Sequence, residues 1–189
     1  MTTRGHACTL LLLALICAGC SRRDRSGSPG GTGAPVDPAL LAFLSRARAA
    51  HHLADNQEEL HPERALVTLR AVINGPLPGR SETRPAEVRE VLADTAARVA
   101  DLESQSADYD AAAQSVSTAL PWVPEPSYFR GHLFEILGLV EERRAQSLSR
   151  GGNLVAANQA KDRALAAFEQ SMNIQAEVIR SSSADAGKK

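Results

Sequence analysis

The cysteines are the side chains of this sequence whose chemistry is most restricted by their position. There are three, Cys8, Cys17 and Cys20, and all lie within the first 20 residues. A thiolate can form a disulfide, bind a metal or accept a covalent group. If the segment before Cys20 is removed, one cysteine remains, and a single thiol forms neither an internal disulfide nor a multi-cysteine metal site. Covalent modification of Cys20 is the chemistry that this arrangement favours.

The segment before Cys20 has the composition of an export signal. Arg4 and His6 precede an apolar run from Ala7 to Ala18. A helix of that length spans about 18 Å, well short of the roughly 30 Å hydrocarbon core of a bilayer. The run is therefore typical of a signal peptide rather than of a membrane span.

The residues at the expected cleavage point resemble the lipobox of bacterial lipoproteins. They are Ile16, Cys17, Ala18, Gly19 and Cys20. Ala18, Gly19 and Cys20 match the pattern, whereas Cys17 stands where leucine is usual. The resemblance implies cleavage before Cys20 and a membrane anchor of lipid chains on its thiol, including palmitate-like acyl groups. An ordinary secretory signal, in which Cys20 has no role, is the alternative.

The residues that follow Cys20 are rich in Gly, Pro and Ser, which is typical of a flexible tether. Ser21, directly after the cysteine, is compatible with delivery to the outer membrane. We therefore expect a signal peptide at residues 1–19, the lipidated cysteine and linker at 20–37, a helical domain at 38–180 and a disordered tail at 181–189.

The overall composition favours an all-α fold. Hydrophobic residues make up 43% of the chain but aromatic residues only 4%, and Ala and Leu are abundant. Such a mixture suits helices that pack through small side chains. The 21 basic and 22 acidic residues give a net charge of −1. No clustered basic face is evident, so we expect no nucleic-acid partner.

Prolines, glycines and capping residues predict six helices in three antiparallel pairs. The expected helices begin at Pro38, run from Pro62 to Asn74, from about Pro85 to Leu102, from Asp108 to Leu120, from about Ser127 to Arg150, and from Asn153 to about Ile179. Asp37, Asp108 and Asn153 are expected to cap three of them. Trp122 is expected to fill the junction between two pairs, and an exposed anchor is the alternative.

The second helices of the three predicted pairs share a pattern of a small residue followed, four positions later, by a larger apolar one. These residues are Ala65 with Leu69, Ala112 with Val116, and Ala164 with Phe168. The small residue would let paired helices approach closely, and the larger one would fill the gap to the neighbouring pair.

This pattern resembles the second helix of the tetratricopeptide repeat, or TPR. Gly138 stands where that family has a residue small enough for helix crossing. The resemblance implies a short TPR-like solenoid of three stacked helical hairpins. The spacings of 47 residues from Ala65 to Ala112 and 52 from Ala112 to Ala164 exceed the family period of about 34. A helical bundle whose alanines merely reflect helix propensity is the alternative.

Stacked hairpins usually bind partners on a concave surface lined by the first helix of each pair. The predicted register gives this surface an acidic character with one apolar patch, which suits a basic or amphipathic peptide. Its expected residues are Asp94, Asp101, Ser104, His132, Glu135, Leu139 and Glu142. An ordinary polar helix face is the alternative.

No motif predicts catalysis, a cofactor or a metal site. His51 and His52 are adjacent and would point about 100° apart on a helix, so they cannot easily share an ion with His61. The run of two glutamates and two arginines at residues 141–144 is expected to be a solvated face with salt-bridge options.

Together these features lead us to expect a non-enzymatic protein of the bacterial cell envelope, anchored by lipid at the outer membrane and facing the periplasm. It would act as a scaffold or assembly factor that binds other envelope proteins or peptides, in the manner of the pilotins that the resemblance suggests. The alternative function is an envelope sensor that binds a ligand or metal through a helical bundle.

Overall fold

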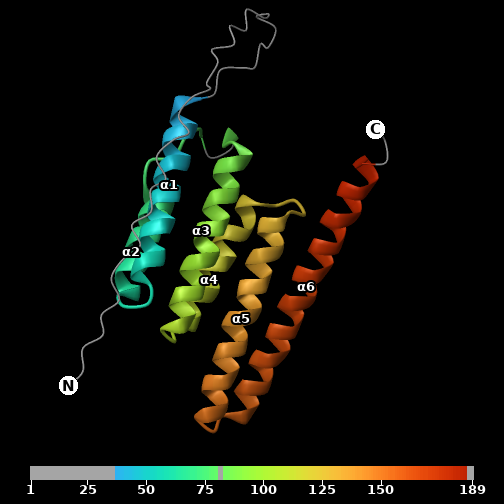
Figure 1. The fold of residues 1–189 in the computed structure, drawn as a ribbon. Helices are drawn as coiled ribbons and strands as arrows, with labels where there is room; N and C mark the ends of the chain where they lie inside the picture. The colour runs from blue at the N-terminus through green and yellow to red at the C-terminus, as the bar shows by residue number, and fades with distance from the viewer. Residues whose placement is uncertain (1–36, 81–82, 187–189) are drawn as a thin grey trace, which may run out of the picture. The chain divides into compact units, whose positions relative to one another are not determined.

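A computed structural model describes residues 37–80 and 83–186, and within them the chain forms six α-helices (Figure 1). The helices are α1 (Pro38–Gln57), α2 (Pro62–Asn74), α3 (Ala86–Gln105), α4 (Tyr109–Ala119), α5 (Tyr128–Arg150) and α6 (Leu154–Ala186), with a short 3₁₀ helix η2 (Leu120–Trp122) after α4. The predicted all-α class is confirmed. The signal peptide and most of the linker, including Cys17, Ala18, Gly19 and Cys20, lie outside the described residues.

The predicted capping residues begin three of these helices. Asp37, Asp108 and Asn153 each accept a side-chain hydrogen bond from a backbone N–H two or three residues ahead, at 2.8, 3.3 and 3.2 Å. A cap of this kind satisfies an N–H group that has no partner within its own helix. Short polar side chains next to Pro, Gly or Tyr therefore set where these helices start.

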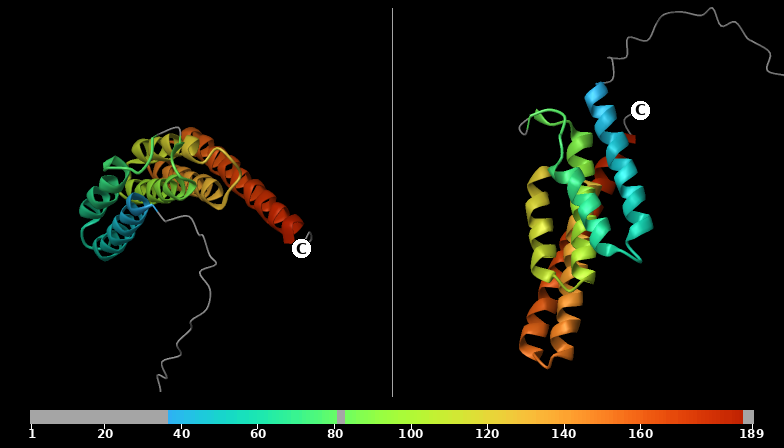
Figure 2. Two further views of the ribbon diagram at one scale, coloured as in Figure 1. Left: turned by 90° about the horizontal axis from the view of Figure 1, so that it is seen from above. Right: turned by 90° about the vertical axis from the view of Figure 1, so that its left-hand side faces the viewer.

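The helices pack in sequential pairs, as Figure 1 and the two views of Figure 2 show. α1 pairs with α2, α3 with α4, and α5 with α6. The second helix of one pair also packs against the first helix of the next, α2 on α3 and α4 on α5. The three predicted helical pairs are thus confirmed.

The core consists of three connected apolar clusters rather than one centre. One joins α1 to α3 through Phe43 and Leu92, and another joins α1, α2 and α3 through residues such as Leu69. The largest joins α3, α4 and α5 around Leu133. Trp122 packs against the first and the largest of these clusters, which confirms that it fills the junction between pairs.

The small residues of the predicted repeat lie at helix contacts. Ala65, Leu69, Ala112 and Val116 are fully buried and Ala164 is nearly so. Phe168 is half-buried, and its ring lies directly against Gly138 of α5. Ala, Gly and a larger partner therefore occupy the interfaces at which close helix approach was predicted.

α6 runs to Ala186, so it includes residues 181–186, for which a disordered tail was predicted. Neither proline nor glycine occurs between Asn153 and Ala186 to end it. The hydroxyls of Ser181, Ser182 and Ser183 also donate hydrogen bonds of 2.9 Å to backbone carbonyls one turn earlier. Local hydrogen bonding thus accompanies a helical end in which the side chains of residues 181–184 are exposed.

Replacing Gly138 by Ala should destabilise the protein. The added Cβ would lie 2.5–2.8 Å from three carbon atoms of the Phe168 ring. Overpacking of this kind costs about 1–3 kcal/mol, more than the roughly 1 kcal/mol that Ala gains over Gly in a helix. Urea unfolding should therefore show a lower midpoint for Gly138→Ala.

Gly131→Ala on the same helix is the matched control. The nearest atom to its Cβ would be Cγ of the flexible Gln175 side chain at 3.3 Å, while Ile174 and the backbone oxygen of Ser171 would lie at ordinary contact distances of 3.6 and 3.7 Å, so we expect no loss of stability. The penalty of Gly138→Ala should also shrink when Phe168 is replaced by Ala. An equal penalty in both backgrounds would contradict the proposed contact.

Candidate functional site

A groove of about 430 Å³ lies between α1 and α3. Apolar side chains and charged ones share its lining. The lining residues are Leu44, Ala47, Arg48, His51, His52, Asp55, Val91 and Asp94. Of the predicted surface residues, Asp94 is therefore the one that lines this groove.

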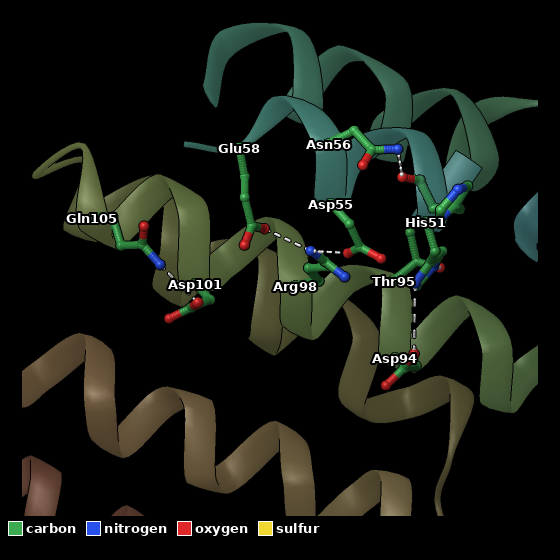
Figure 3. Close-up of polar contacts among 10 residues, drawn as sticks. His51, Asp55, Asn56, Glu58, Asp94, Thr95, Arg98, Asp101 and Gln105 are labelled. Atoms are coloured by element: carbon green, nitrogen blue, oxygen red, sulfur yellow. Dashed lines mark hydrogen bonds and ion pairs between the residues drawn. The ribbon is translucent and has the colours of Figure 1, made fainter. Parts of the chain in front are cut away.

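His51 is the most constrained polar side chain of the groove (Figure 3). Its Nε2 lies 2.8 Å from the hydroxyl of Thr95, and that hydroxyl donates to the carbonyl of Val91 at 2.7 Å. Because the Thr95 hydroxyl has one hydrogen, Nε2 must donate to it. The other ring nitrogen, Nδ1, lies 3.9 Å from the Asp94 carboxylate and is free to take up a proton.

Burial lowers the pKa of His51 below its ordinary value of 6.5, and the nearby positive charge of Arg98 acts in the same direction. Asp94 and Asp55 oppose this effect by favouring the charged ring. At neutral pH the ring is therefore uncharged and serves as a hydrogen-bond donor between α1 and α3.

Arg98 of α3 joins the two helices further along the same face (Figure 3). Its guanidinium pairs with the carboxylates of Asp55 and Glu58, the latter at 2.6 Å. Two carboxylates around one guanidinium use several of its five donors at once. Arg98 was not singled out from the sequence, since its partners are about forty residues away and no local pattern links them.

Asp101 and Ser104 contact α5 rather than an open surface. Arg143 of α5 pairs with Asp101 at 2.6 Å and also donates to the Ser104 hydroxyl. Ser104 is only 2% exposed, so its predicted place on a partner surface is wrong. Arg98 and Arg143 also neutralise part of the acidic character that was predicted for this face.

The α5 residues of the predicted surface interact mainly within their own helix. His132 Nδ1 lies 3.3 Å from Glu135, and its ring stacks on Tyr128. Glu135 and Glu142 are exposed, whereas Leu139 packs against the largest apolar cluster. His132, Glu135 and Glu142 thus form a polar face of α5, and none of them lines the groove between α1 and α3.

The expectation of a solvated face with salt-bridge options at residues 141–144 is wrong for Glu141, which is buried, while Arg143 and Arg144 form salt bridges. Glu141 is 5% exposed and pairs with Arg163 of α6 at 2.8 Å. Arg144 pairs with Asp110 of α4, and Arg143 with α3 as described above. Glu141 follows Gly138 by three residues, so the spacing that places Gly138 against α6 would have placed Glu141 there too.

A second buried carboxylate, Glu103, also escaped the sequence analysis. It is 3% exposed and accepts hydrogen bonds from Arg70 of α2 at 2.6 Å and from Ser115 of α4 at 2.8 Å. Because α3 lies between these two helices, Glu103 connects consecutive pairs. Its contacts are structural and leave no carboxylate oxygen directed at a ligand.

Over residues 37–80 and 83–186, no three His, Cys, Asp or Glu side chains come close enough to hold a metal ion. His51 bonds to Thr95, while His61 lies 3.6 Å from Glu63. The same ranges include no helix long and apolar enough to cross a bilayer.

Over the described residues, the fold is thus all-helical, with six helices packed in sequential pairs. No protein-family model, no curated protein and no solved structure matches the chain.

Replacing His51 by Gln should reduce the amount by which the free energy of unfolding falls as the pH is lowered. The folded pKa of His51 is lowered, so below about pH 6.5 the unfolded chain binds a proton that the folded protein resists. The contribution of His51 to the free energy of unfolding is fully present above pH 6.5 and is lost as the pH falls through the pKa that His51 has in the folded protein. Urea midpoints at pH 7.5 and pH 5 would measure the difference.

The neighbouring His52, which is exposed, provides the matched control. His52→Gln should keep the acid sensitivity of the unaltered chain. If His51→Gln loses as much stability between the two pH values as the unaltered protein does, the argument from burial fails.

Proposed function

We propose that this chain is a lipid-anchored scaffold of the bacterial cell envelope, which binds other envelope proteins or peptides. The observation that carries the anchor is the run Ile16-Cys17-Ala18-Gly19-Cys20 behind a short apolar segment. Lipid chains on Cys20 would hold the helical part at the outer membrane, facing the periplasm.

The helical part is, in this proposal, a short TPR-like solenoid. Three features support it: sequential pairing, packing of each second helix on the next first helix, and small residues at the contacts. Such stacks present the first helices of their pairs to partners. α1 and α3 are first helices, and the groove between them is the partner site that we propose.

The chemistry of the groove suits a basic or amphipathic segment. Leu44 and Val91 offer apolar contact, and Asp55 and Asp94 place carboxylates at the same groove. Asp55 is already paired with Arg98, whereas Asp94 is 43% exposed and lies 3.9 Å from the neutral His51. Asp94 is therefore the carboxylate best placed to meet a partner's cation.

Cys20→Ala tests the anchor. We expect the variant to leave the membrane fraction and to lose incorporation of labelled palmitate, since each buried CH₂ of a lipid chain contributes about 0.8 kcal/mol to membrane binding. Cys8→Ala, in the same leader, is the matched control and should remain membrane-bound and labelled. A Cys20→Ala protein that stays lipidated would disprove the anchor.

Asp94→Lys tests the groove. Affinity purification from solubilised envelopes should recover a partner with the unaltered chain and about tenfold less of it with Asp94→Lys, since like charges repel across an interface. Glu177→Lys, an exposed charge reversal on α6, should recover it fully. Equal recovery by both variants would mean that the partner does not bind at the groove between α1 and α3.

A further inference from the structure

Both ends of the helix stack expose apolar surface. α1 and α2 pack on α3, while at the other end α6 packs on α5. Stacked repeats normally cover their terminal pairs with polar residues, because an apolar end invites further association. The two terminal pairs described here depart from that rule.

The first of these surfaces, which we call the α1/α2 groove, has a volume of about 490 Å³. Leu53 and Val67 line this groove, and 47% and 68% of their respective surfaces are exposed. Among the described residues that line it, Arg46 and Thr68 are the two with polar side chains. Small residues supply much of the rest, namely Ala47, Ala49, Ala50, Ala71 and Gly75.

The second surface, which we call the α6 stripe, consists of Leu165, Met172 and Ile179. These side chains are 61%, 61% and 66% exposed. Residues seven apart differ by only about 20° around a helix, so the three form one line. The residues that α6 buries, such as Ala160 and Ala164, lie on another face of the helix.

The groove and the stripe are complementary in shape and charge. The lining residues of the groove cover about 15 Å of α1, from Phe43 to Leu53, and the stripe is longer, about 21 Å from Leu165 to Ile179. The stripe carries large side chains, whereas small ones line much of the groove. Arg46 lines the groove, while the exposed carboxylates Asp162 and Glu169 flank the stripe.

The packing within the chain indicates which occupant the groove takes. Each second helix packs against the first helix of the following pair, α2 on α3 and α4 on α5. Within the described residues, α6 is a second helix with no following pair, and α1 is a first helix with no preceding one. A second copy of this chain can supply α6 with a following first helix and α1 with a preceding second helix.

We propose that α6 of one copy docks through Leu165, Met172 and Ile179 into the α1/α2 groove of a second copy. The contact joins two different surfaces, so it is heterologous and leads to chains or closed rings. This self-association goes beyond the proposed scaffold function and does not depend on the lipid anchor.

The test uses two full-length copies with different C-terminal tags, co-expressed and solubilised in mild detergent. One variant is Val67→Glu, which places a charge in the groove, and another is Met172→Glu, which places one on the stripe. Both positions are more than half exposed, so neither should unfold the protein, and circular dichroism checks this. The readout is capture of one tagged copy by the other.

Unaltered copies should capture each other, and capture should fall about tenfold or more when both copies carry Val67→Glu or both carry Met172→Glu, because burying a lone carboxylate is costly. A Val67→Glu copy mixed with a Met172→Glu copy should be captured again, since the first retains the stripe and the second retains the groove. Leu60→Glu, an exposed apolar residue outside both surfaces, should change nothing.

Three results would overturn the proposal. Capture between two Val67→Glu copies would mean that α6 pairs with α6. If the mixed pair failed to capture each other, the stripe and the groove would not be contacting one another. Absence of capture between unaltered copies would mean that something else, such as the chain's own apolar run at residues 7–18 or a foreign protein, fills the groove.

Discussion

Where the helices of this protein cross, the contact is made by small side chains. Ala65, Ala112 and Ala164 are buried in the second helices, and Gly138 lets the Phe168 ring approach the backbone of α5. Such residues bring helix axes toward the short end of the usual 8–10 Å range. Each buries little apolar area, so stability depends on many close contacts rather than on a few large side chains.

Close approach also explains where the charged residues are buried. Glu103 lies between α2 and α4, and Glu141 lies between α5 and α6, each held by an arginine from a neighbouring helix. A buried carboxylate is tolerated only when its partners are in place, because the lone charge would lose its hydration without compensation. These pairs therefore favour one lengthwise alignment of the helices over alternatives shifted by a turn.

The sequence was sufficient to predict the helices and their pairing, because the signals involved are local. Asp37, Asp108 and Asn153 precede helices as caps, and prolines mark several of the helix boundaries. The contacts of Trp122 followed from its place between prolines at the end of a pair. Local spacing was also enough to find the small residues at the helix crossings.

The polar contacts of the candidate site were largely beyond sequence reasoning. Arg98 with Glu58, Arg143 with Asp101 and Arg70 with Glu103 join residues 33–42 positions apart. The partner of a surface arginine depends on which helices are neighbours and on their rotation, and a one-position error in rotation moves a side chain by about 100°. Ser104 and Glu141 were misplaced for this reason, whereas Asp94 was placed on the groove.

The position of Trp122 determines which structural changes its fluorescence can detect. It is the one tryptophan of the chain, and it packs against clusters built from α1, α3, α4 and α5. α6 contributes no residue to those clusters within the described part of the chain. Fluorescence of Trp122 should therefore respond to changes at the contacts between helical pairs but not to detachment of α6. Circular dichroism would still detect that detachment as a loss of helix.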